Sequence, residues 1–133
     1  MKMSRRKLRE SIFLLIFRIE FNTREELQEQ VELYLDSKSE MDEADAEYIR
    51  NKVEDILNHL AELDETILKI CKGWRLERLG KAELAILRLA VYELVDDKDI
   101  PTSVAINEAV ELAKIYCSEE APRFVNGVLA KLA

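Results

Sequence analysis

The sequence predicts an all-α fold of about seven helices in a single domain that spans residues 1–133. Only three glycines and two prolines occur, whereas the strong helix formers alanine, leucine, glutamate and lysine are abundant. Apolar residues recur at helical spacing along most of the chain, and no segment alternates as a strand would. A chain of this length is also long enough to bury one core without disulfides or metals.

The segment from Glu83 to Leu94 is predicted to be a buried central helix. Nine of its twelve residues are apolar or aromatic, and they surround most of the helical wheel instead of forming one stripe. The run is too short and too often interrupted by charge for a membrane span, which needs about 20 apolar residues. We expect its charged residues to be solvated at the edges of the packing. Alternatively, Glu83 and Arg88 form an exposed docking face.

Two helices are predicted in the first part of the chain. The first covers Arg5 to Phe21. Thr23 and Glu26 have the spacing of a capping box, which opens a second helix that runs to about Asp36. The inward face of the first helix is expected to hold Leu8, Ile12, Leu15, Ile16 and Ile19, with Phe13 and Phe17 beside that face.

The middle of the chain predicts a long helix and a short one. Asp42 is expected to cap a helix that continues to about Leu63, and Asp64 to restart a shorter helix that Gly73 ends. Trp74, which follows, is interpreted as a core residue and not as a stacking platform for bases. The acidic residues near Asp42 lack the glycine and the distal glutamate of a calcium loop.

Two more helices are predicted after the central one. Thr102 or Ser103 caps the first of them, and Pro122 suits the first turn of the last. Gly127 lies inside the last helix, where glycine costs about 1 kcal/mol relative to alanine. We therefore expect a close approach at Gly127, by a neighbouring helix in the first instance, or by a nucleic-acid backbone.

Charge is distributed unevenly along the chain. The net charge is −7, but residues 1–9 contain five basic residues and no acid. The remaining 124 residues contain 15 basic and 27 acidic residues, a net charge of −12. Positive charge at a helix N-terminus opposes the helix dipole, so folding alone does not favour this basic arm. A basic arm on an acidic body indicates a local nucleic-acid contact, although a solvated helix end would look the same.

No motif of enzyme chemistry occurs. The sequence has no phosphate-binding glycine loop and no zinc-protease or serine-hydrolase motif. Cys71 and Cys117 lie far apart on apolar faces, and His59 has no ligand partner at metal-binding spacing. We expect no catalytic residue, no cofactor and no metal. The apolar run at the N-terminus is flanked by charge and has no cleavage site, so we expect a cytoplasmic protein.

Four segments of the second half are distinctive: WRLERL (74–79), AILRLA (85–90), VAINEAVELAK (104–114) and FVNGVL (124–129). In these segments, and in its arginine-rich start, the chain resembles the NusB family of transcription antitermination factors. The resemblance implies two three-helix subdomains around the central helix. It also implies binding of the boxA element of nascent RNA, above all from ribosomal-RNA operons, together with the ribosomal protein NusE. The RNA polymerase complex with other Nus factors would be a further partner, with no membrane contact and a possible homodimer.

The resemblance also implies two sets of site residues. Those carried over to RNA binding are Lys2, Arg5, Arg6, Lys7, Arg9, Arg123, Phe124 and Asn126. Arginine suits this role because it pairs bidentately with phosphate and stacks on bases. Phe124 could equally be a core residue. Those carried over to NusE binding are Phe17, Glu83 and Arg88. An acidic face suits a basic ribosomal protein.

Two alternative functions remain open from the residues. One is an RNA-binding accessory module of an RNA-modifying enzyme, since NusB-like domains also precede methyltransferase domains. No methyl-donor motif follows Ala133, which counts against it. The other is a protein-interaction or homodimerisation module whose arginines are only solvated.

Overall fold

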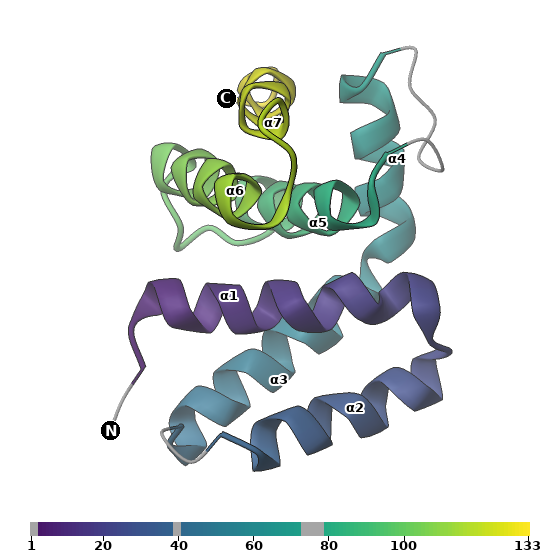
Figure 1. Cartoon of the computed structure of the whole chain (residues 1–133), viewed down its shortest axis with the longest axis vertical. Coiled ribbons are helices and arrows are strands. Elements are labelled where there is room, and N and C mark those ends of the chain that lie inside the picture. The colour runs from purple at the N-terminus through teal and green to yellow at the C-terminus, as the bar shows by residue number, and fades with distance from the viewer. Residues whose placement is uncertain (1–2, 39–40, 73–78) are drawn as a thin grey trace. The chain divides into compact units, whose positions relative to one another are not determined.

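The computed structural model describes residues 3–38, 41–72 and 79–133, which contain seven α-helices, one 3₁₀ helix and no strand. The predicted all-α fold is confirmed. The chain divides into two compact units, residues 1–58 and 59–133, and the helices of each can be followed in Figure 1.

The first unit contains α1 (Arg5–Ile16), the 3₁₀ helix η1 (Phe17–Phe21), α2 (Arg24–Asp36) and α3 (Glu43–Asn58). Helix α1 packs against both α2 and α3 (Figure 1). It contributes several buried side chains to the core of this unit. The largest fully buried side chains of this unit are those of Phe13, Leu15, Ile16, Leu27, Ile49, Val53 and Ile56.

Side-chain caps fix the starts of α2 and α3 where the sequence predicts them. The hydroxyl of Thr23 accepts a hydrogen bond from the Glu26 amide at 3.2 Å, and the Glu26 carboxylate accepts one from the Thr23 amide at 2.7 Å. This is the complete capping box. The Asp42 carboxylate accepts a hydrogen bond from the Asp45 amide at 2.8 Å. Both caps satisfy amides that have no partner within the helix.

Two details of the first unit differ from prediction. The helix expected to continue to Phe21 tightens into η1 after Ile16. Phe13 was placed beside the apolar face but is only 1% exposed. Because α1 is covered by two helices, its buried stripe is wider than the single row of positions that the spacing identifies.

The predicted boundary between the third and fourth helices is wrong. Helix α3 ends at Asn58 and α4 (Leu60–Ile70) begins two residues later, whereas the sequence analysis continued one helix to Leu63 and restarted at Asp64. The break falls at His59, with φ −110° and ψ 11°, and neither glycine nor proline marks it. It coincides with the boundary between the two units.

The second unit consists of α4, α5 (Lys81–Val95), α6 (Thr102–Tyr116) and α7 (Ala121–Ala130). Helix α5 packs against all three others, and every residue from Leu84 to Glu93 is buried. The prediction of a buried central helix is therefore confirmed.

Two charged residues of α5, Arg88 and Glu93, are buried, which contradicts the expectation that they are solvated. Arg88 is 4% exposed and Glu93 is 5% exposed. The Nε and Nη2 atoms of Arg88 each donate a 2.8 Å hydrogen bond to one carboxylate oxygen of Asp64 in α4. This bidentate pair lets a charged side chain enter the core, because a buried guanidinium needs an acidic partner.

The predictions for Gly73 and Trp74 concern residues outside the described part of the chain. Within the described residues, no helix combines the length and apolarity needed to cross a membrane. Both cysteines carry free thiols.

Candidate nucleic-acid interface

The basic arm continues directly into the first turn of α1. Ser4 is the N-cap, and its hydroxyl accepts a hydrogen bond from the Lys7 amide at 3.2 Å. Arg5, Arg6 and Lys7 therefore occupy the first three helical positions, and all three are exposed. This turn contains no acidic residue. Three cations at the positive end of a helix dipole give a strongly positive surface.

Arg9 does not share this exposure. It is 9% exposed, so most of its side chain lies within the protein surface. The predicted patch therefore consists of three exposed cations followed by a largely buried one. Lys2, predicted to extend the patch, lies outside the described residues.

A buried carboxylate that the sequence analysis missed anchors the arm. Asp45 in α3 is 2% exposed, and its Oδ2 atom accepts a hydrogen bond from the backbone amide of Met3 at 2.8 Å. The chain just before α1 is thereby tied to the start of α3. In the sequence, Asp45 is one of the acidic residues near Asp42 that lack the pattern of a calcium loop. No local pattern identifies a contact between residues 42 positions apart.

A second basic surface lies on α7, where a shallow hollow of about 350 Å³ opens beside Phe124. Arg123 and Phe124 line it, and they are joined by Lys72 and Lys131, which the sequence analysis missed. The Nζ atom of Lys131 donates a 2.8 Å hydrogen bond to the Ile70 carbonyl, which ties the end of α7 to the end of α4. The hollow thus combines an aromatic side chain with three basic ones, the combination that binds a base and its phosphates.

Phe124 and Asn126 occupy different positions on α7. Phe124 is half-buried and lines two hollows, so it is both part of the packing and available at the surface. The two alternatives that the sequence left open therefore both describe it in part. Asn126 is exposed and lines neither hollow.

The expectation that a neighbouring helix packs closely on Gly127 is wrong. Gly127 is exposed, and a Cβ atom added to it would meet no atom of the described residues within 4 Å. It also lines the basic hollow. Packing by the described residues therefore does not explain a glycine in the middle of α7, whereas the approach of a ligand at this hollow would.

The candidate partner residues have distinct environments. Phe17 is half-buried between Phe13 and Phe21, with ring centroids 6.4 Å and 5.4 Å away. Phe21 is 59% exposed and extends this aromatic row to the surface. Arg88 is not the exposed docking residue that was predicted, since it is buried against Asp64.

Glu83 is half-buried and folds over the start of α5. A Cβ atom added to Gly80, the N-cap, would lie 3.1 Å from its Oε1 atom. Glu83 also lines a second hollow of about 350 Å³, together with Ser118, Glu120 and Phe124. Its carboxylate is favourable at a helix N-terminus in any case, so the fold alone gives a reason for an acid here.

Comparison with known proteins identifies the family. The model of the NusB family matches residues 6–133. The chain belongs to the NusB family. It is 50% identical over 131 residues to the transcription antitermination protein NusB of Agathobacter rectalis, covering 98% of this chain and 100% of that protein.

Solved structures of the NusB family share the fold. A crystal form of T. maritima NusB superposes with a TM-score of 0.87 at 35% identity, covering 100% of this chain and 92% of that one. A crystal structure of the antitermination factors NusB and NusE in complex with dsRNA superposes with a TM-score of 0.80 at 31% identity, covering 96% of this chain and 94% of the other.

The titratable groups near these surfaces do not provide a reactive thiol. Burial raises the pKa of Cys71. Burial, and then the charge of Glu83, raise the pKa of Cys117 to about 11. Both thiols are therefore protonated at neutral pH, whereas a nucleophilic cysteine needs a lowered pKa. No cluster of three or more histidines, cysteines or acids that could hold a metal occurs in residues 3–38, 41–72 and 79–133.

Proposed function

We propose that this protein is a transcription antitermination factor that binds boxA RNA of nascent ribosomal-RNA transcripts together with NusE. The observation that carries the proposal is the match of residues 6–133 to the NusB family. The structural neighbour crystallised as NusB with NusE and dsRNA supports both partners.

The proposed RNA contacts lie on two helices. Arg5, Arg6 and Lys7 of α1 are exposed and contact phosphates, and the largely buried Arg9 adds a fourth positive charge two residues further along the helix. Lys2 extends this group. Phosphate contacts of this kind supply most of the affinity and make it depend on salt.

The hollow on α7 holds an unpaired base and its backbone. The ring of Phe124 offers a stacking surface, and Arg123 offers a guanidinium for phosphate. We add Lys72 and Lys131 to the RNA contacts because they line the same hollow. Asn126 contacts RNA from the neighbouring exposed position.

NusE contacts Glu83 of the second unit and, as a separate contact, the aromatic row of Phe17 and Phe21 in the first unit. A carboxylate and exposed aromatic rings suit a basic protein partner. Arg88 acts through Asp64, by holding α4 against α5, and does not itself touch NusE.

The protein acts by assembly and not by catalysis. It operates in the cytoplasm as one NusB-like RNA-binding domain over residues 1–133, in a complex that joins RNA polymerase and other Nus factors. The raised pKa values of both thiols support a role without covalent chemistry.

Fluorescence anisotropy of labelled RNA tests this function. Labelled boxA RNA is titrated with the protein alone and with NusE, against a scrambled RNA of equal length, at two salt concentrations. We expect tighter binding to boxA, strengthened by NusE and weakened by salt. Equal, weak binding to both RNAs with no effect of NusE would overturn the proposal.

A further inference from the structure

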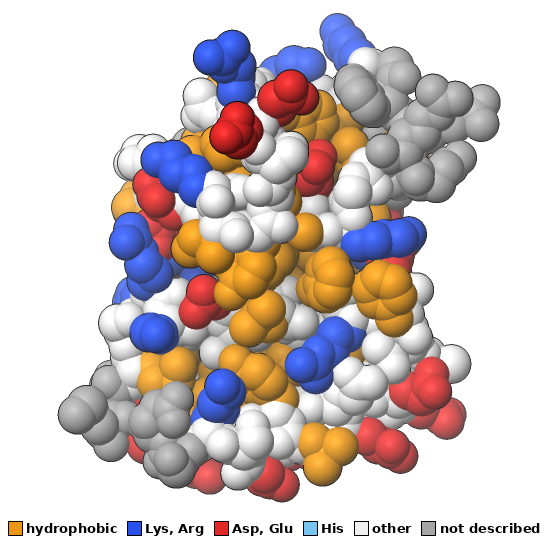
Figure 2. Space-filling view, in the orientation of Figure 1, with side chains coloured by type: hydrophobic (Ala, Val, Ile, Leu, Met, Phe, Trp, Pro, Cys, Tyr) orange, Lys and Arg blue, Asp and Glu red, His pale blue; other side chains and the backbone are white. Residues whose placement is uncertain are grey.

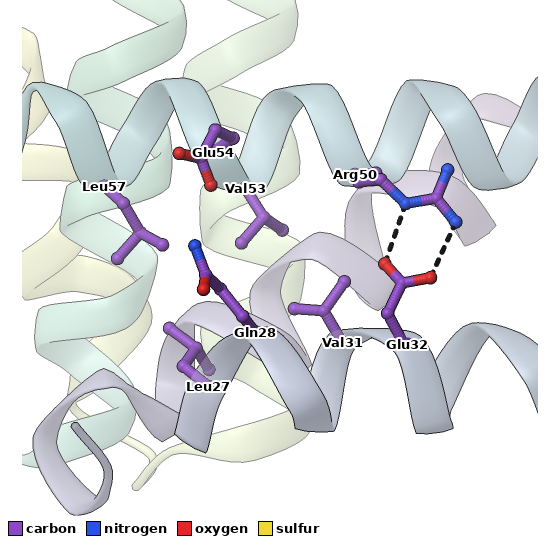
Figure 3. A pocket seen from close by; sticks show the side chains of 8 residues that line it. All are labelled: Leu27, Gln28, Val31, Glu32, Arg50, Val53, Glu54 and Leu57. Atoms are coloured by element: carbon purple, nitrogen blue, oxygen red, sulfur yellow. Dashed lines mark hydrogen bonds and ion pairs between the residues drawn. The ribbon is translucent and has the colours of Figure 1, made fainter. Parts of the chain in front are cut away.

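A groove of about 230 Å³ lies between α2 and α3, and none of its lining residues is among those assigned to RNA or NusE. Its floor is apolar, and Figure 3 shows Val31 of α2 and Val53 of α3 lying between the two helices. The side chains that line it are those of Leu27, Gln28, Val31, Glu32, Arg50, Val53, Glu54 and Leu57.

Charged side chains bridge the two helices on either side of this apolar floor. Arg50 forms a bidentate pair with Glu32, with Nε to Oε2 at 2.8 Å and Nη2 to Oε1 at 3.0 Å (Figure 3). Arg24 donates 2.7 Å hydrogen bonds to Glu54 and to Asn58. Helices α2 and α3 pack mainly on α1, so these long side chains span the distance between them.

The surface around the groove is acidic. Residues 24–58 contain twelve acidic and four basic residues, a net charge of −8. Figure 2 shows acidic side chains along the lower edge of the view, over α2 and α3. Arg50 also donates to Glu47 at 3.0 Å, so its charge is taken up by two carboxylates of the protein itself. This field repels RNA and anionic lipid and attracts a basic protein segment.

We propose that the α2–α3 groove is a docking site for a basic amphipathic protein segment, which inserts one aliphatic or aromatic side chain between α2 and α3. The groove is smaller than the roughly 300–1,000 Å³ of sites for small organic ligands, but one anchor side chain fits a space of this size. Lysines and arginines beside the anchor pair with Glu32 and Glu54 on the rim. This partner contact is additional to the proposed binding of RNA and NusE.

A designed peptide tests the proposal. The probe is a fluorescein-labelled peptide of about twelve residues, or three helical turns, made of lysine and alanine with two leucines four positions apart. One matched probe replaces the leucines by serine, and another replaces the lysines by glutamate. We expect the first probe to bind, and both matched probes to bind at least tenfold more weakly, since the anchor and the charge are both required.

Charge reversal on the protein locates the contact. The double variant Glu32→Lys with Glu54→Lys should weaken peptide binding about tenfold. Each reversed exposed charge should lower the peptide affinity by a factor of roughly three to five. The control variant Glu29→Lys with Glu65→Lys changes the net charge by the same amount at exposed positions outside the groove. Its peptide affinity should stay within about twofold of that of the unchanged protein. Gln28→Trp covers the groove without a change of charge, and should also weaken binding.

Two results would overturn the docking site: equal binding of the serine probe, or equal loss of affinity in the Glu29 and Glu65 control. Circular dichroism checks that each variant is folded. The variant Glu83→Lys separates this proposal from the proposed function, because it should leave peptide affinity unchanged. Failure of boxA binding with intact peptide binding would overturn only the proposed function. Intact boxA binding with no peptide binding would overturn only the docking site in the groove.

Discussion

Replacing Gly127 by alanine is the most informative single substitution, because it should make the protein more stable and less able to bind RNA. Gly127 lies inside α7 and is exposed. No atom of the described residues would lie within 4 Å of the added methyl group. The methyl group therefore has room in the folded protein, and the helix gains the propensity of alanine.

The expected stabilisation follows from helix propensity. Glycine is about 0.8–1.0 kcal/mol less favourable than alanine inside a helix. No atom of the described residues would clash with the added methyl group, so the free energy of unfolding should rise by about 1 kcal/mol. For a domain of this size, that corresponds to an increase in Tm of about 4 °C.

Thermal and urea unfolding followed by circular dichroism measure this change, and Gly80→Ala is a control of opposite sign. Gly80 is the N-cap of α5, where alanine is less favourable than glycine by about 0.5 kcal/mol. Its added Cβ atom would also lie 3.1 Å from the Glu83 carboxylate. We therefore expect Gly127→Ala to stabilise the protein and Gly80→Ala to destabilise it.

The RNA measurement completes the test. If a nucleic-acid backbone approaches α7 at Gly127, the methyl group should weaken boxA binding several-fold although the protein is more stable. An unchanged or lower Tm would show that a neighbouring part of the protein occupies this space. A higher Tm with unchanged RNA affinity would refute the inference that a ligand requires this glycine.

Three further substitutions test individual contacts. Asp64→Ala leaves the buried guanidinium of Arg88 without its bidentate partner, and should lower the free energy of unfolding by about 2–3 kcal/mol in urea titrations. Thr23→Ala removes one half of the capping box and should cost about 1 kcal/mol in the same titrations. Glu83→Gln removes a negative charge that raises the pKa of Cys117, so the pKa should fall from about 11 and iodoacetamide alkylation at pH 9 should become roughly twofold to fivefold faster.

The controls for these substitutions come from the same chain. Glu65→Ala removes an exposed carboxylate next to Asp64 and should change stability by no more than about 0.5 kcal/mol. An equal loss of stability in Asp64→Ala and Glu65→Ala would contradict the importance of the buried pair between Arg88 and Asp64. A Thr23 variant as stable as the parent would mean that water replaces the cap. Unchanged alkylation of Cys117 would exclude a contribution from the Glu83 charge.

Local sequence signals predicted the helices well where a cap or a strong apolar run marks them. The capping box at Thr23 fixed the start of α2, and the almost uninterrupted apolar run identified α5 as the buried centre. These features depend on residues close in sequence, so spacing alone was sufficient. The break at His59 has no such marker, and the periodicity of the apolar residues hides it.

Buried charges could not be predicted from spacing, because their partners are distant in sequence. Arg88 pairs with a residue 24 positions away, and Asp45 binds the backbone of a residue 42 positions away. The hollow on α7 could not be predicted from spacing either, because Lys72 lines it together with residues more than 50 positions later in the chain, such as Arg123. At Gly127 the sequence indicated an unusual position, but only the structure shows that no described residue packs against it.

The most direct test of the central claim is boxA binding by a variant that lacks the exposed cations of the arm. We expect Arg5→Ala, Arg6→Ala and Lys7→Ala together to keep or slightly increase Tm, because three positive charges at a helix N-terminus oppose the dipole.

The same triple variant should lose most of its affinity for boxA RNA in the presence of NusE, and the slope of log affinity against log salt should fall by about 2. The control replaces the exposed Lys69, Lys98 and Lys114 by alanine, which removes the same charge elsewhere. Loss of boxA binding in the arm variant alone is the predicted result. Equal affinity of the two variants would contradict RNA recognition by the arm.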